Sequence, residues 1–313
     1  MPTLGGFTDT LASIYRSVEY CKATNRSLLI DTTKHVYKIN FSNYFTFRCG
    51  CPVEADITTI NRLLKTNGMT LFPNSLNLAE LCESNYQLGY NSVNKKVYCE
   101  SKSSPDIKIE CTGTHTRGQI TLSTQLEEDI ILVPGIGSNI GAALYVIQNM
   151  LKFTQQFSDY MVQQYDHAKN MLGEDYLCVQ VRNTDLLSDC EELYSSNQEL
   201  IHNYSNVYIC TDNKNTLDFF TNKGVKNVFN FTTFPANQHI VDPSKNYNNY
   251  KPVAVPLHQS DIPGDTQIKD LLLDIAIAQD SARLITNSVG GFTKLCNRIK
   301  SCLKTNIIQH LSC

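Results

Sequence analysis

Charged side chains follow two apolar runs in the second half of the chain. Arg182 comes directly after "YLCVQV" (176–181), with Asp185 three residues later, and Asp212 follows "NVYICT" (206–211). A guanidinium can bind two phosphate oxygens at once, which a lysine ammonium cannot. We therefore expect Arg182 to bind an anion, with Asp185 orienting it through an ion pair.

A glycine pair follows a third apolar run, "ARLIT" (282–286). Gly290 and Gly291 precede a helical pattern that begins at Phe292. Glycines allow the backbone N–H groups at a helix N-terminus to approach an anion closely, most simply a phosphate. The polar neighbours of the pair are Asn287, Ser288 and Thr293. The alternative is an ordinary strand-to-helix turn that binds nothing.

The elements that must position these residues alternate along the second half. Strands are predicted at 176–181, 206–211, 225–231 and 282–286, with helical stretches between several of them. This alternation predicts an α/β domain with a parallel sheet. Ligands bind at the carboxyl ends of the strands in such sheets, so the residues above should lie along one edge.

The helix before the last strand, in "GDTQIKDLLLDIAIAQDSA", is predicted to be scaffold. Its apolar residues recur at helical spacing on one face. Asp270 and Asp274 lie four residues apart on the other side. We interpret them as a solvent-exposed face rather than a metal site.

The first half begins with the same kind of unit. "GGFTDTLASIYRSVEYCKATNRSLLID" (5–31) predicts a helix from near Thr8 or Asp9 and a short strand ending at Asp31. "EEDIILVPGIGSNIGAALYVIQNM" (127–150) predicts a strand at 130–133 and a helix from Ala142, leading into a long helical stretch over 151–172. Residues 41–125 show no clear pattern.

The segment "GIGSNIG" (135–141) is similar to a dinucleotide-binding fingerprint. The second strand and the acidic residue that bind the ribose do not follow it. We prefer a strand-to-helix turn near a domain junction.

Length and composition indicate a folded protein with two domains. The chain has 313 residues, 42% of them hydrophobic, and a net charge of -3 without a basic patch, which argues against nucleic acid as a partner. No apolar stretch is long enough to span a bilayer and no secretory leader is recognisable, so we expect a cytoplasmic protein. Most of the 12 cysteines are expected to be buried thiols, and neither cysteines nor histidines show a metal-site spacing.

Four blocks together resemble the fucosyltransferase superfamily. "VQVRNTD" (179–185) resembles the His-x-Arg-Arg-Thr-Asp signature, and "ICTDN" (209–213) resembles the end of the second strand. "LLLDIAIAQDSARLITNSVGGFTKL" (271–295) is similar to the closing motif, and residues 5–31 to the glycine-rich N-terminal motif. The blocks occur in the expected order and span most of the chain.

The resemblance implies a GT-B fold, an α/β architecture with two Rossmann-like domains facing a cleft. Residues 1–150 would hold the acceptor and residues 151–313 the nucleotide sugar, and the last helix could pack back on the N-terminal domain. Arg182 would bind the donor diphosphate, and Asp212 would lie near the nucleoside or sugar. The other donor-binding residues would be Gly5, Gly6, Phe7, Asn287, Ser288, Gly290, Gly291, Phe292 and Thr293.

The chain departs from the signature at two positions. Gln180 replaces the histidine and Asn183 the second arginine, which leaves both the nucleotide and the sugar open. The chain has no Asp-x-Asp motif, so we expect no metal and no cofactor, with Arg182 and the helix N-terminus stabilising the leaving diphosphate. Asp9 is the candidate base for the acceptor hydroxyl, and its alternative role is a helix N-cap.

These features favour an inverting, metal-independent glycosyltransferase acting on a glycan hydroxyl, with fucose from GDP-fucose as the first guess. Another sugar, such as xylose or rhamnose from a UDP or dTDP donor, is the nearest alternative. A nucleotide-sugar-binding protein without catalysis is a second one, motivated by Gln180 and Asn183. An oxidoreductase that binds a dinucleotide through residues 135–141 is a third.

Overall fold

The computed structural model describes residues 6–32, 37–66, 70–72, 86–91, 96–101, 108–110, 127, 130–131, 139–182, 188–234, 261–288 and 290–313. The chain divides into two compact units, residues 1–154 and 155–313. The division that we predicted after residue 150 lies four residues from this boundary.

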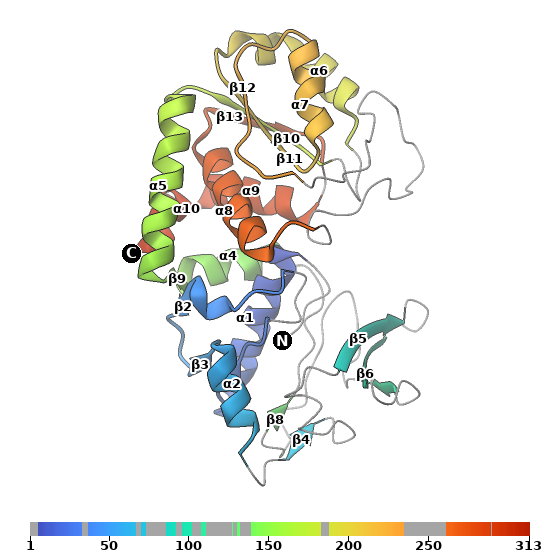
Figure 1. The fold of residues 1–313 in the computed structure, drawn as a ribbon, viewed down its shortest axis with the longest axis vertical. Coiled ribbons are helices and arrows are strands. Elements are labelled where there is room, and N and C mark those ends of the chain that lie inside the picture. Colours follow the sequence, from blue (N-terminus) through green and yellow to red (C-terminus); the bar gives the residue numbers. More distant parts are fainter. Residues whose placement is uncertain are drawn as a thin grey trace. The chain divides into compact units, whose positions relative to one another are not determined.

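The first unit combines helices with several small sheets (Figure 1). Its helices are α1 (Phe7–Thr24), the 3-10 turn η1 (Phe41–Asn43), α2 (Ile57–Leu64) and α4 (Ile140–Asn149). Its strands are β1 (Leu28–Leu29), β2 (Phe45–Phe47), β3 (Val53–Glu54), β4 (Leu71–Phe72), β5 (Tyr86–Asn91), β6 (Lys96–Ser101), β7 (Lys108–Glu110), β8 (Ile130–Ile131) and β9 (Leu151–Phe153). The pairs β1–β3 and β4–β8 are parallel, whereas β2–β9 and β5–β6–β7 are antiparallel.

Helix α1 forms much of the core of this unit. Leu11, Ile14 and Val18 are buried at three- and four-residue spacing, as the sequence pattern predicts. The helix ends at Thr24, and the left-handed backbone of its C-cap Asn25 (φ 54°) lets the N–H of Arg26 donate to the carbonyl of Cys21 at 2.8 Å. On the same helix, Tyr15 packs edge-on against Tyr145 of α4, with ring centroids 5.3 Å apart.

The expected long helix over 151–172 is wrong at its start. Residues 151–153 form strand β9, which pairs with β2, and helix α5 (Gln155–Leu172) begins after it. The reason is cross-strand packing, because Leu151 and Phe153 are buried and the Phe153 ring lies 5.8 Å from that of Phe45.

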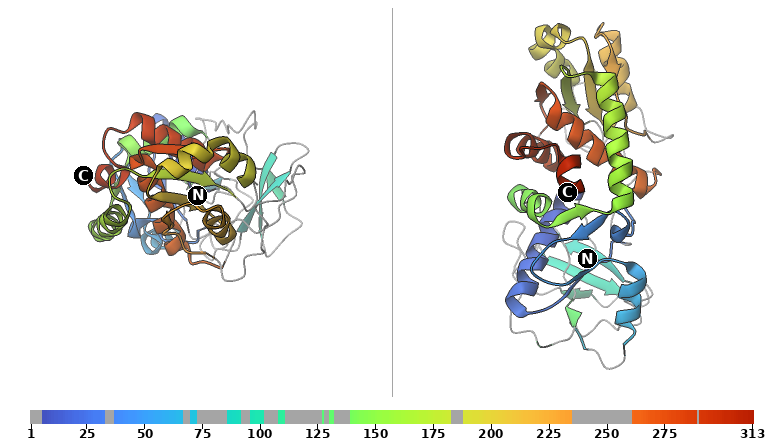
Figure 2. Two further views of the ribbon diagram at one scale, coloured as in Figure 1. Left: turned by 90° about the horizontal axis from the view of Figure 1, so that it is seen from above. Right: turned by 90° about the vertical axis from the view of Figure 1, so that its left-hand side faces the viewer.

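The second unit is a doubly covered parallel sheet (Figure 1 and Figure 2). Its strands are β10 (Leu177–Val181), β11 (Val207–Thr211), β12 (Val228–Phe229) and β13 (Arg283–Thr286), in the spatial order β12-β11-β10-β13. Its helices are α5, α6 (Cys190–Asn203), α7 (Lys214–Asn222), α8 (Gly264–Asp280), α9 (Gly291–Cys302) and α10 (Ile307–Ser312). The predicted parallel α/β sheet is thus confirmed, with β12 shorter than expected.

The two faces of this sheet differ in chemistry. One face presents Val179, Val181 and Ile209 to an apolar core formed with α6 and α7. The alternate residues Cys178, Gln180, Tyr208 and Cys210 are also buried, but on the face toward α8 and α9. Polar groups on that second face must find partners inside the protein.

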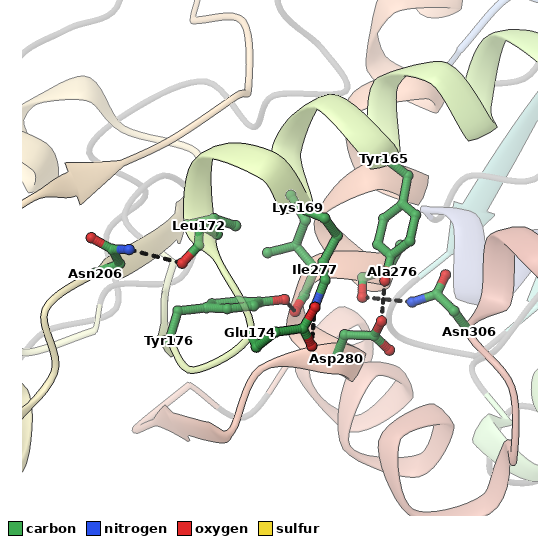
Figure 3. A network of polar contacts seen from close by, with 10 residues as sticks. All are labelled: Tyr165, Lys169, Leu172, Glu174, Tyr176, Asn206, Ala276, Ile277, Asp280 and Asn306. Atoms are coloured by element: carbon green, nitrogen blue, oxygen red, sulfur yellow. Dashed lines mark hydrogen bonds and ion pairs between the residues drawn. The ribbon is translucent and has the colours of Figure 1, made fainter.

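The carboxyl end of α8 is anchored by side chains from several elements (Figure 3). The Tyr176 hydroxyl donates to the carbonyl of Ile277 (2.7 Å), and the Asn306 amide donates to that of Ala276 (3.0 Å). The hydroxyl of Tyr165 on α5 bonds to the Asp280 carboxylate. These side chains add hydrogen bonds to carbonyls in the last turns of the helix, where the carbonyl of Ile277 also accepts the N–H of Ser281, and the bond from Asn306 fixes α10 on α8.

Candidate functional site

The order of the strands defines where a ligand would bind. From β10 the chain proceeds outward to β11 and β12, and β13 then pairs with the opposite side of β10. The order therefore reverses between β10 and β13, and such a switch point opens a crevice at the carboxyl ends of the two strands. Arg182 follows β10 there, and Asn287 and Ser288 follow β13.

Arg182 and Ser288 meet at this switch point. The backbone N–H of Arg182 donates to the Ser288 hydroxyl oxygen at 3.2 Å, and it lies 3.3 Å from the hydroxyl oxygen of Ser188. The two serine hydroxyls also bond to each other. The end of β10, the start of α6 and the turn after β13 are thus joined at one point.

A second pair of bonds fixes the same turns. The Asn287 amide donates to the carbonyl of Asp189 at 2.8 Å, and the Ser188 N–H donates to the carbonyl of Arg182 at 2.9 Å. Asn287 is exposed, whereas Arg182 and Ser288 are half-buried. The predicted residues after β10 and β13 therefore come together at a site that solvent can reach.

Beneath these turns, Gln180 connects β10 to β13 and α9. Its side-chain oxygen accepts hydrogen bonds from the hydroxyls of Thr286 and Thr293, each at 2.7 Å. The Thr286 oxygen in turn accepts the N–H of Ser288 at 3.0 Å. Gln180 is 4% exposed and Thr293 is 3% exposed. The predicted donor-binding hydroxyl of Thr293 is therefore directed to Gln180.

Helix α9 begins at the glycine pair without a side-chain cap. Gly290 is the N-cap, with φ -66° and ψ 168°, and the helix starts at Gly291, one residue before the predicted position. Helices α1 and α8 also lack a side-chain cap, whereas side-chain caps are supplied to other helices by Asp56 (α2), Asn139 (α4), Asp189 (α6), Asn213 (α7) and Asn306 (α10). A helix N-terminus without such a cap can direct backbone N–H groups and its positive dipole end at an anion.

Asp212 lies at the same edge of the sheet, one residue after β11, and is half-buried. Its neighbour Asn213 is buried and caps α7, with its side-chain oxygen accepting the N–H of Asn215 at 3.0 Å. Asp185 lies outside the described residues, as does the stretch 183–187 that contains it.

The predicted N-terminal site residues lie at the start of α1 in the first unit. Gly6 is the N-cap of α1 and has no side-chain cap, as at α9. Phe7 is buried and stacks on Phe45 with ring centroids 6.3 Å apart, so its side chain is part of the core. Gly5 lies outside the described residues.

Asp9 is the third residue of α1, so its alternative interpretation as the N-cap is wrong. Its carboxylate acts on Arg16, two turns further along. Burial lowers the pKa of Arg16, and the negative charge of Asp9 partly opposes this change. Asp9 is half-buried, with a charged neighbour on its own helix.

The interpretation of Asp270 and Asp274 as a solvent-exposed face is wrong. Asp274 is 8% exposed, accepts hydrogen bonds from Tyr208 and Thr232, and lies under the polar face of the sheet. Burial is the main cause that raises its pKa from 3.8 to about 7. The Asp270 carboxylate accepts the N–H of Thr233 at 2.8 Å, and burial raises its pKa as well.

Sequence reasoning did not assign three residues to this site, namely Gln180, Ser188 and Thr286, and it considered Gln180 only as a departure from the signature. A signal existed for the first, since a glutamine inside the run "YLCVQV" needs a buried partner. A signal also existed for the second, since "SDCEEL" (188–193) has the acidic first turn of a helix start.

Within the described part of the chain, no group of three or more His, Cys, Asp or Glu side chains could hold a metal ion. Among those same residues, no helix is both long and apolar enough to cross a membrane.

The second unit thus has the parallel sheet and switch point of a Rossmann-like α/β domain. Among solved structures, the chain is similar to NodZ, an α-1,6-fucosyltransferase. Against the crystal structure soaked with GDP-fucose the TM-score is 0.54 at 16% identity, over 95% of this chain and 89% of that chain. Against the selenomethionine structure of NodZ from Bradyrhizobium the TM-score is 0.50 at 17% identity, with the same coverage. The predicted fucosyltransferase-like fold is confirmed by this likeness.

No family model matches the chain, and no curated protein matches it. At such low identity the likeness to NodZ concerns the fold. The GT-B arrangement, in which two domains face each other across a cleft, remains a prediction.

Proposed function

We propose that this protein is a glycosyltransferase that uses a nucleoside diphosphate sugar, with fucose as the first candidate sugar and a glycan hydroxyl as the acceptor. The observation that carries the proposal is the meeting of Arg182 with the turn after β13 at the switch point of the second unit. The similarity in fold to a fucosyltransferase whose crystals were soaked with GDP-fucose supports the same class of donor.

In the proposed reaction, the acceptor oxygen forms a bond to the anomeric carbon of the donor sugar as the bond from that carbon to the diphosphate oxygen breaks. The electron pair of the broken bond goes to the departing diphosphate. Arg182 and the N–H groups at the start of α9 stabilise the charge that develops there, which is the main way a preorganised site lowers such a barrier. Ser288 and Asn287 hold the turn in place through their bonds to Arg182 and Asp189.

The mechanism is proposed to be inverting and independent of metal. A guanidinium and a helix N-terminus can supply the positive charge that a cation would provide. Inversion requires that the proton of the acceptor hydroxyl be removed on the opposite side of the sugar from the leaving group. Asp9 is the proposed base, and Asp185 is proposed to orient Arg182.

Two alternatives keep the same donor site. One is transfer of another sugar, such as xylose or rhamnose from a UDP or dTDP donor, since Gln180 and Asn183 depart from the fucosyltransferase signature. The other is donor binding without turnover. The dinucleotide hypothesis is weaker, because the Asn139 side chain already accepts the N–H of Ala142 at the start of α4 (2.9 Å), although residues 132–138 lie outside the described part.

A ligand panel tests the proposal. Melting temperatures are measured with GDP, UDP, CMP and dTDP and with their sugar conjugates, because a ligand that binds only the folded state raises the apparent stability. We expect one nucleoside diphosphate and its sugar to raise the melting temperature above all others. Release of that diphosphate from its sugar conjugate then separates a transferase from a binding protein. A protein that responds only to NAD(H) or NADP(H) contradicts the proposal.

A further inference from the structure

Gln180 takes two hydroxyl hydrogen bonds on a single oxygen atom. Thr286, the last residue of β13, donates one of them, and Thr293, in the first turn of α9, donates the other, both at 2.7 Å. The two threonines stand on either side of the proposed phosphate-binding turn. Gln180 therefore ties both ends of that turn to the central strand β10.

The chain of hydrogen bonds continues to the surface of the site. Because Thr286 donates its hydroxyl proton to Gln180, its oxygen is free to accept the N–H of Ser288 at 3.0 Å. The Ser288 hydroxyl then accepts the N–H of Arg182 at 3.2 Å. The buried amide thus fixes the direction of the Thr286 hydroxyl, and two backbone N–H donors continue the chain from Thr286 to Ser288 and from Ser288 to Arg182, the residue proposed to bind the diphosphate.

The chemistry of residue 180 is constrained by this arrangement. An amide oxygen has two lone pairs and no charge, so it can accept both hydroxyls at once. A neutral imidazole has only one accepting nitrogen, and an imidazolium has none. A carboxylate could accept both, but it would add a negative charge beneath a site proposed to bind phosphates.

We propose that Gln180 is the positioning residue of the donor site, holding the turn from Thr286 to Thr293 in the geometry that binds the diphosphate. This inference rests on the proposed function. Glutamine in place of the signature histidine is then an adaptation to the two threonine donors, and the donor site is not lost at this position.

The test separates positioning from stability. Gln180→Leu removes the acceptor and leaves two hydroxyls without it, so the melting temperature falls. The triple variant Gln180→Leu/Thr286→Val/Thr293→Val also removes both hydroxyl donors, which avoids the cost of leaving them unpaired, although the N–H of Ser288 then loses its acceptor on Thr286. The matched control is Gln267→Leu, which makes the same change at a second buried glutamine. The amide of Gln267, on α8, donates to the carbonyl of Ile262, which precedes that helix.

Affinity is measured by calorimetry with GDP, UDP and dTDP, and the tightest ligand of the unmodified protein is used for every variant. For Gln180→Leu and for the triple variant we expect dissociation constants higher by about ten-fold or more. The triple variant should nevertheless regain part of the lost melting temperature, and Gln267→Leu should keep the affinity of the unmodified protein.

Three results would overturn the inference. They are a triple variant that regains affinity together with stability, a triple variant that does not fold, and a Gln180→Leu variant that binds as tightly as Gln267→Leu. If the unmodified protein binds none of the three nucleotides, the proposed function fails, and the inference fails with it. The binding of the unmodified protein therefore tells which of the two is wrong.

Discussion

At the scale of single residues, Arg182 carries the chemistry that we propose. Its backbone is fixed by Ser188 and Ser288, so its side chain starts from a defined point at the edge of the sheet. We expect Arg182→Ala to lower kcat by about 10²-fold or more, the size of effect seen when a preorganised group that stabilises developing charge is removed.

Arg182→Lys should restore little of this activity, because an ammonium cannot grip two phosphate oxygens in the planar geometry of a guanidinium. Steady-state release of the nucleoside diphosphate measures both variants. Full activity in both would show that Arg182 is not the residue that stabilises the leaving group.

Asp274 gives a second prediction at this scale, about stability and pH. The folded protein keeps the proton on Asp274 up to about pH 7, whereas an unfolded carboxyl loses it near 3.8. Between these values the folded state binds more protons, so the free energy of unfolding should fall as the pH rises. The stabilisation is complete below about 3.8 and is lost as the pH rises through about 7.

The asparagine side chain in Asp274→Asn is neutral at every pH, so this variant should not show the fall in the free energy of unfolding that Asp274 causes as the pH rises. Relative to the unmodified protein it should gain up to roughly 4 kcal/mol in the free energy of unfolding between pH 4 and pH 8. Urea unfolding at several pH values measures the difference, with Asp261→Asn at an exposed position as the control. Parallel pH profiles for the unmodified protein and Asp274→Asn would contradict the burial of a protonated acid.

Residues that follow strands could be placed from the sequence, whereas the burial of a polar residue inside a helix could not. The approach of Arg182 to Ser288 follows from two strand ends in one parallel sheet, so it could be predicted. The burial of Asp274 could not, because a spacing of four residues marks one face of a helix but does not tell whether a polar strand face covers it. Tyr208 and Thr232, which bond to Asp274, are remote in sequence.

At the scale of elements, the anchoring of α10 on α8 is set by Asn306 (Figure 3). Its side-chain oxygen caps α10 by accepting the N–H of Ile308 (2.9 Å), and its amide donates to the carbonyl of Ala276 (3.0 Å). Asn306→Ala therefore removes a cap and also removes a buried hydrogen bond to the carbonyl of Ala276 on α8. We expect it to lower the free energy of unfolding by about 2–3 kcal/mol.

A cap on the same unit serves as the comparison. Asp189 caps α6 at an exposed position by accepting the N–H of Glu192 at 2.9 Å. Asp189→Ala removes this bond, and we expect it to lower the free energy of unfolding by about 1 kcal/mol. Chemical denaturation measures both. If Asn306→Ala costs no more than Asp189→Ala, the buried bond to Ala276 contributes nothing.

Element prediction succeeded where the local pattern was regular. Helix α1 begins within two residues of its predicted start, and the strands at 177–181, 207–211 and 283–286 lie within about one residue of their predicted ends. It failed for β9, because "LKF" has no local feature that separates it from the helix after it. The pairing of β9 with β2 joins residues about a hundred positions apart, which no local pattern can show.

At the scale of the whole molecule, the fold and the site support each other. The strand order β12-β11-β10-β13 places the switch point where the sequence places its arginine and its glycine pair. The alternation of strands and helices predicted the class of the second unit. The order of the strands was not predictable from that alternation, and the small sheets of the first unit follow from no pattern that we recognised.

The central claim is that a guanidinium and a helix N-terminus bind a diphosphate without a metal ion. Calorimetric titration in excess EDTA tests it most directly, comparing the preferred nucleoside diphosphate with the same nucleoside, in the unmodified protein and in Arg182→Ala. We predict that the diphosphate binds at least about ten-fold more tightly than the nucleoside in EDTA, and that Arg182→Ala removes most of this difference. Loss of the difference on adding EDTA to the unmodified protein would contradict the claim.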